Sequence, residues 1–201
     1  MVRWTAVLAV IVCASAASAA TLIDKQPDLG PYWYPVGNNP TYVYADSFIA
    51  PAGDTVVDSV GTWLQPITYY GGQFHALVTF QIWGDTGGPD FTKVLGSSAQ
   101  FSTETPGLNL YTMPISADLV AGQRYWFILS GVGGDPSRDS YQIGAHTPGS
   151  DGGTFWYSND PLGHTFDGQG LTPEMAFQVH LTPEPASLAL LALGLAIARR
   201  R

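Results

Sequence analysis

Residues 174–181 read EMAFQVHL, and their alternation decides the fold class. The side chains at 175, 177, 179 and 181 are apolar and fall on one face of an extended strand. Residues 76–83 read ALVTFQIW and repeat the pattern, with apolar residues at the even positions. Residues 125–129, YWFIL, are apolar on both faces, which predicts a central strand. The period of two indicates β-structure.

Glycine and proline interrupt every run that could otherwise be helical. The chain holds 23 Gly and 15 Pro, and between residues 31 and 183 the longest stretch without either is eleven residues, Gln73–Trp83. A packed helix needs about that length without interruption. We therefore predict an all-β fold: a two-sheet antiparallel sandwich, jelly-roll-like, over residues 41–182, after an irregular segment 21–40. About nine strands are expected: 42–49, 55–64, 76–83, 92–95, 108–113, 125–129, 141–146, 154–158 and 174–181.

The first twenty residues are typical of a secretory signal peptide. Arg3 supplies the positive charge, residues 5–14 form a short apolar helix, and Ala17-Ser18-Ala19 is a small-x-small cleavage site. Cleavage is expected after Ala19 or Ala20. The alternative is a retained anchor, but ten apolar residues span only about 15 Å of a core of about 30 Å. Cleavage also removes Cys13, the single cysteine, so no disulfide is expected.

The C-terminal end of the chain carries a second targeting signal. Pro183, Glu184 and Pro185 precede thirteen residues, 186–198, that have no charge, and the chain ends with Arg199, Arg200 and Arg201. An apolar helix followed by arginines is a stop-transfer pattern. Thirteen residues give only about 20 Å of helix, which suits a transient signal better than a permanent tail anchor, the alternative interpretation.

This three-part tail, residues 183–201, resembles the PEP-CTERM sorting signal of Gram-negative bacteria. The resemblance implies that a membrane-embedded exosortase recognises and removes the tail during export. It therefore implies the secretion machinery and an exosortase as partners, and transient contact with the membrane through the C-terminal helix. The expected route is an inner-membrane intermediate and then the cell surface or extracellular matrix.

Two internal segments carry a second resemblance. Residues 82–89 read IWGDTGGP, and residues 119–126 read LVAGQRYW. This hairpin and strand start resemble the choice-of-anchor β-sandwich domains of exported bacterial proteins. Here Asp90 and Phe91 follow the proline, where a glycine is expected. The family implies no catalytic residues.

Charge and composition exclude several function classes. Only 12% of residues are charged, about half the usual share, and the formal charge is −8. Removing both ends takes away four of the eight Lys and Arg and one of the sixteen acids, which leaves about −11. Such a surface repels nucleic acid and anionic lipid. The four histidines never fall at metal-ligand spacing, so zinc is not expected.

The remaining candidate sites are aromatic and acidic loop residues. Trp33, Trp156 and Tyr157 lie in aromatic clusters near loops and could stack on sugar rings; alternatively, they close the ends of the sandwich. Acids in Gly-rich loops could converge on calcium, although Asp and Asn are also ordinary turn residues. The calcium candidates are Asp135, Asp139, Asp151 and Asp160, with Asn159 and Asp167 beside them.

No residue is singled out as catalytic, and no cofactor other than calcium is considered. The sequence favours an exported, non-catalytic surface or matrix β-sandwich protein. The first alternative is a secreted carbohydrate-binding module, with extracellular polysaccharide as partner. The second is a secreted hydrolase, which would require two loop carboxylates facing one cleft.

Overall fold

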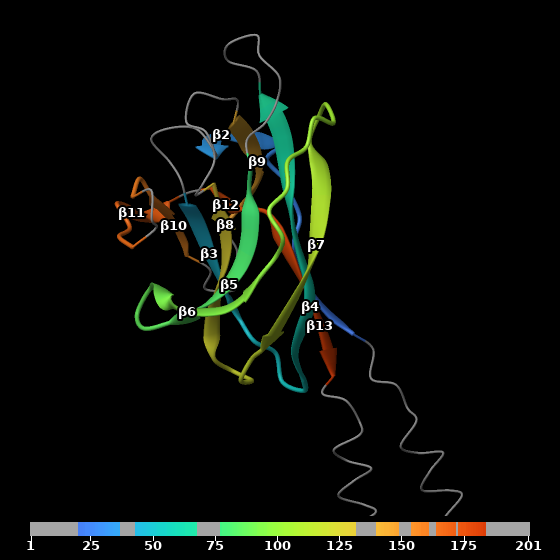
Figure 1. Cartoon of the computed structure of the whole chain (residues 1–201), viewed down its shortest axis with the longest axis vertical. Coiled ribbons are helices and arrows are strands. Elements are labelled where there is room, and N and C mark those ends of the chain that lie inside the picture. The colour runs from blue at the N-terminus through green and yellow to red at the C-terminus, as the bar shows by residue number, and fades with distance from the viewer. Residues whose placement is uncertain are drawn as a thin grey trace, which may run out of the picture.

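The computed structural model describes residues 20–36, 43–67, 77–131, 140–148, 154–160, 164–171 and 173–183. Within these ranges the chain forms strands and no helix (Figure 1). The strands are β1 Thr21–Lys25, β2 Pro31–Val36, β3 Val43–Ile49, β4 Asp54–Ile67, β5 Thr79–Asp85, β6 Pro89–Ser97, β7 Asn109–Asp118, β8 Arg124–Ser130, β9 Ser140–His146, β10 Phe155–Ser158, β11 Gly168–Leu171, β12 Glu174–Met175 and β13 Phe177–Pro183.

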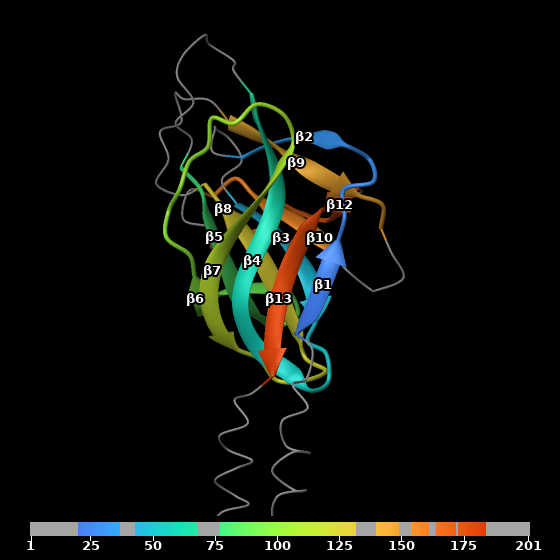
Figure 2. The ribbon, with the colours of Figure 1, turned by 90° about the vertical axis from the view of Figure 1, so that its right-hand side faces the viewer.

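The strands form two antiparallel sheets that face each other as a sandwich (Figures 1 and 2). The seven-stranded sheet has the order β1-β13-β4-β9-β12, with β7 paired to β4 and β2 paired to β9. The six-stranded sheet has the order β11-β10-β3-β8-β5-β6. The central position of β8, between β3 and β5, confirms the prediction from residues 125–129.

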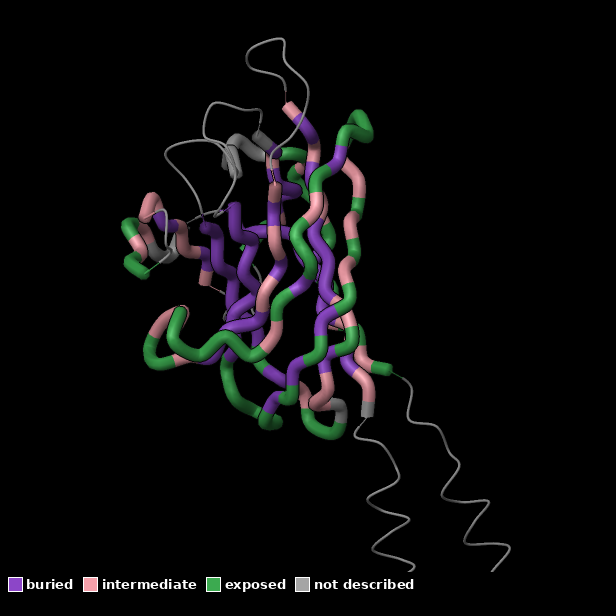
Figure 3. Tube along the Cα trace, viewed as in Figure 1, coloured by how far each residue is buried: buried purple, intermediate pink, exposed green. Residues whose placement is uncertain are grey.

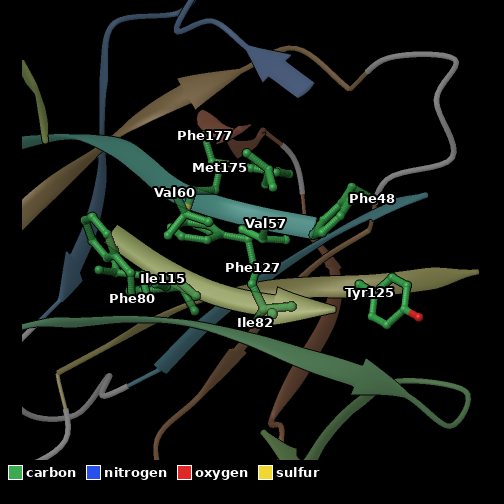
Figure 4. Close-up of a cluster of buried hydrophobic side chains, with 14 of the residues drawn as sticks. Phe48, Val57, Val60, Phe80, Ile82, Ile115, Tyr125, Phe127, Met175 and Phe177 are labelled. Carbon is green, nitrogen blue, oxygen red and sulfur yellow. The ribbon is translucent and has the colours of Figure 1, made fainter. Parts of the chain in front are cut away.

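The core lies between the sheets and is built from the alternating strands (Figure 3). Phe177 of β13 stacks on Phe127 of β8 at a centroid distance of 5.2 Å, and Phe80 of β5 meets Phe127 at 5.5 Å. Figure 4 shows these side chains from the two sheets meeting in one cluster. Met175, Phe177, Val179 and Leu181 are all buried, which confirms the face predicted for residues 174–181.

The all-β sandwich is confirmed, and a strand occupies each of the nine predicted positions. The irregular segment predicted at residues 21–40 is wrong, because β1 and β2 lie there and join the sandwich. β1 is ordered by β13, about 155 residues further along the chain. β2 begins at Pro31 and contains Pro35, which makes it read as a loop, yet it pairs with β9. The two predicted terminal helices lie outside the described residues.

Gly96 of β6 lies where no side chain fits. A Cβ atom there would stand 2.6 Å from Cγ2 of Ile115 and 2.7 Å from the backbone oxygen of Ser116, both in β7. Gly96→Ala is therefore expected to lower the free energy of unfolding by about 1–3 kcal/mol in urea denaturation. The control Ser97→Ala, at an exposed neighbouring position, should stay within about 0.5 kcal/mol. Equal stability of the two variants would show that β6 and β7 do not approach this closely.

Candidate functional site

The two ends of the described chain lie at the same end of the sandwich. Thr21 of β1 pairs with Leu181 of β13, and Pro183 pairs with Asp54. β1 and β13 run side by side in both views (Figures 1 and 2). Ala20, the first described residue, is exposed directly before β1. The predicted signal-cleavage point and the start of the predicted tail are therefore neighbours in space.

Most processing residues fall outside the described ranges. This applies to Ala17, Ala19, Glu184, Pro185, Arg199, Arg200 and Arg201. Pro183 is described as the last residue of β13. The described strands thus begin directly after the predicted signal peptide and end at the first residue of the predicted tail.

A second hydrophobic cluster covers the outer face of the six-stranded sheet. Along β3 and β8 the side chains alternate: Tyr44 and Phe127 belong to the core, whereas Val43 and Trp126 belong to this outer cluster. Phe166 packs on it from the segment before β11. The aromatic ring centroids of the outer cluster are 5.4 Å apart for Trp126–Trp156, 5.8 Å for Trp156–Phe166 and 6.4 Å for Trp83–Phe166.

Beside the outer cluster lies a pocket of about 210 Å³, which we call the outer pocket. Its wall includes Phe91, whose ring stacks on the imidazole of His164 at 4.4 Å between centroids. Trp83 donates from Nε1 to Oε1 of Gln81 at 3.0 Å, so indole and amide are held together. The outer pocket is lined by Val43, Gln81, Trp83, Phe91, Val94, Ser130 and His164, with no acid, lysine or arginine among them. It can stack on an apolar ring face and exchange hydrogen bonds with neutral groups.

The structure separates the three aromatic residues singled out in the sequence. Trp156 belongs to the outer cluster, whereas Tyr157 packs against the core on the opposite face of β10. Trp33 lies in β2 of the other sheet, and its side chain is outside the described set. The indole Nε1 of Trp156 is buried and has no hydrogen-bond partner within the described residues. Trp156 and Tyr157 therefore face opposite sides of their sheet, and a sugar-binding role of Trp33, Trp156 and Tyr157 stays a prediction.

The outer pocket was missed, although the alternation of residues 76–83 contained its signal. If Phe80 and Ile82 face the core, Gln81 and Trp83 must face outward. An outward tryptophan beside an amide is a pattern that sequence reasoning could have singled out. Phe91 and His164 gave no such signal, because the pairing of β5 with β6 and the return of the chain after β10 bring them there.

The described calcium candidates act as turn residues. Oδ2 of Asp160 accepts the backbone N–H of His164 at 2.9 Å, and Oδ2 of Asp167 accepts that of Asn159 at 2.6 Å. Asp135, Asp139 and Asp151 lie outside the described residues. Within the ranges that the structure covers, no three His, Cys, Asp or Glu side chains are grouped as metal ligands. Calcium binding stays a prediction.

A buried charge cluster joins the two sheets. Nζ of Lys25 donates to Oδ1 of Asp46 at 3.2 Å and to Oε2 of Glu174 at 3.0 Å, and it lies 5.1 Å from the ring centroid of Phe177. Oδ2 of Asp46 accepts the backbone N–H of Met175 at 3.0 Å. Lys25 and Glu174 come from β1 and β12 of the seven-stranded sheet, and Asp46 comes from β3 of the six-stranded sheet. The cluster therefore ties the sheets together at one point.

Burial controls the ionisation of this cluster. Asp46 is fully buried, and desolvation raises its pKa to about 7 although the Lys25 ammonium acts in the opposite direction. The neighbouring carboxylate of Glu174 contributes to the rise. One ammonium facing two carboxylates is neutral only when one carboxyl is protonated, which agrees with the raised pKa. The cluster is shielded from solvent, so losing one of its charges would leave an unpaired charge in the interior.

Comparison with known proteins identifies the tail. Residues 181–201 match the family model described as the PEP-CTERM protein-sorting motif. No curated protein matches the chain. No helix long and apolar enough to cross a membrane occurs within the described residues. The resemblance to choice-of-anchor domains stays a prediction. The chain therefore carries a PEP-CTERM sorting motif that begins within its last strand, β13, and this motif implies export and exosortase-dependent sorting in Gram-negative bacteria.

Proposed function

We propose that the protein is a non-catalytic structural or adhesive component of the cell surface or extracellular matrix. The observation that carries this proposal is the sorting motif joined to a sandwich that continues to Pro183. The motif directs the sorting of the protein, and the disulfide-free sandwich is the part that reaches the cell surface or matrix. The expected route runs through an inner-membrane intermediate, anchored by the apolar segment at 186–198 until the exosortase acts.

The fold supports a defined orientation for this intermediate. The first residue of β1 pairs with β13 close to the end of that strand, so the signal peptide and the tail are attached at the same end of the sandwich. The opposite end, where β3 starts at Val43 and β8 stops at Ser130, then points away from the membrane. The charge of about −11 on the processed domain also opposes contact with anionic lipid.

Replacing Arg199, Arg200 and Arg201 with Ala is expected to abolish tail removal and surface delivery. The cluster holds the tail in its stop-transfer orientation, so its loss removes the geometry in which the exosortase meets the motif. The full chain is expressed in its own host, and each fraction is analysed by mass spectrometry. The wild-type protein should start at residue 20 or 21, lack its tail and appear outside the inner membrane.

The matched control is Arg124→Ala, which removes an exposed arginine from the folded domain. This variant should be processed like the wild type. Surface delivery of the triple variant at the wild-type level, or a wild-type protein that keeps its tail, would contradict the proposed route. The hydrolase alternative has no geometric support within the described residues, whereas the carbohydrate-binding alternative is favoured by the outer pocket.

A further inference from the structure

We propose that the outer pocket binds one neutral pyranose unit of an extracellular polysaccharide. This inference goes beyond the sorting function and does not depend on it, because every lining residue belongs to the folded domain. The lining of the outer pocket contains none of Trp33, Trp156 and Tyr157, the aromatic candidates from the sequence. Trp83 lines the outer pocket and also belongs to the outer cluster, on which Trp156 packs.

The first argument is the chemistry of the lining. A pyranose presents an apolar C–H face and a rim of hydroxyl groups, so it needs an aromatic surface beside neutral hydrogen-bonding groups. Phe91 and Trp83 supply rings, while Gln81 and His164 supply an amide and an imidazole. Phe91 is 38% exposed, so its ring is accessible from solvent.

The second argument is the orientation of the polar groups. The Gln81 amide accepts from Trp83 through Oε1 and donates to Oγ of Ser97 through Nε2, at 3.0 and 3.4 Å. An amide has two N–H donors and two acceptor lone pairs, so these contacts leave one donor and one lone pair for a ligand. Such a donor–acceptor pair suits a sugar hydroxyl, which both donates and accepts.

The volume of the outer pocket and the charge of its lining limit the class of ligand further. A volume of about 210 Å³ is below that of pockets for drug-sized ligands, so it suits one ring. Among the described residues no acid, lysine or arginine lines the pocket of this strongly acidic protein, which favours a neutral sugar over a uronic acid. The pocket reaches Val43 and Ser130, at the end of the sandwich opposite to Pro183. It is therefore placed away from the processing end.

The test uses protein processed by and purified from its own host. Titration calorimetry and saturation-transfer NMR measure binding of methyl glucoside, methyl galactoside, N-acetylglucosamine and glucuronate, with indole as an aromatic probe. At least one neutral sugar should bind, and Phe91→Ala should weaken it at least tenfold, whereas Phe91→Tyr should retain it. The matched control is Leu95→Ala, on the same strand and equally exposed at 39%, which does not line the pocket and should change affinity less than twofold.

Each other outcome overturns the inference. The pocket does not recognise neutral sugars if none of them binds, if glucuronate binds at least as well, or if indole alone binds. Equal losses in Phe91→Ala and Leu95→Ala would place the sugar elsewhere. Thermal unfolding of each variant establishes that it is folded. Surface delivery is unaffected by these results, so a failed pocket leaves the sorting route standing.

Discussion

Lys25→Met is expected to lower the free energy of unfolding by about 3–5 kcal/mol. The substitution keeps the length of the side chain but removes the ammonium that, among the described residues, pairs with both Asp46 and Glu174. Two carboxyl groups then stay buried without a counter-charge, and removing one member of a buried ion pair typically costs this much. Urea denaturation of the processed protein at pH 7 measures the loss.

The matched control for this prediction is Lys93→Met. Lys93 is also a lysine paired with an acid, Asp90, at 3.7 Å, but its side chain is 53% exposed. A surface ion pair whose lysine is exposed contributes only about 0–1 kcal/mol, so the control should remain close to the wild type. Combining Lys25→Met with Asp46→Asn and Glu174→Gln should recover part of the loss. Equal effects of the two lysine substitutions would contradict the buried cluster.

Alternation explains why the strands and the core could be predicted. β5 and β13 carry their apolar residues at every second position, and these residues form the interface between the sheets. β8 is apolar on both faces because it carries the core on one side and the outer cluster on the other. The jelly-roll-like connectivity stays a prediction, which the partial orders β1-β13-β4-β7 and β3-β8-β5-β6 support.

The features that the sequence did not reveal all depend on distant pairing. Lys25 and Glu174 are 149 positions apart and meet only because β1 lies along β13. In an isolated strand, Glu174 reads as part of a polar face; in the protein it is buried beneath Lys25. The outer pocket likewise combines β3, β5, β6, β8 and the segment after β10. The local sequence pattern carries no information about such contacts. The signal peptide and the sorting motif could be predicted because the residues of each signal follow one another in the sequence.

Stability is expected to fall as the pH rises from about 4 to about 7. The pKa of Asp46 is raised from 3.8 to about 7 in the folded protein, so in this range the folded state binds a proton that the unfolded state has released. By linkage, the stabilisation is fully present below pH 4 and is lost as Asp46 ionises. Three pKa units correspond to a change on the order of 4 kcal/mol.

Asp46→Asn isolates this contribution from other titrations. Asparagine stays neutral at every pH and keeps an oxygen that can accept a hydrogen bond, so the variant should lose most of the decline between pH 4 and 7. Asp90→Asn is the control, because the pKa of that carboxyl is lowered, chiefly by its hydrogen bond from Thr92, which gives the opposite sign. Urea midpoints across this pH range, for the wild type and both variants, measure the difference.

Parallel curves for wild type and Asp46→Asn would show that Asp46 is already ionised at low pH, in which case the attraction of Lys25 outweighs the effect of burial on the pKa of Asp46. A steeper decline of stability with pH in the wild type than in Asp46→Asn would instead show that the Lys25 ammonium neutralises only one of the two carboxylates. The buried charge cluster would then stabilise the contact between the sheets most strongly in mild acid.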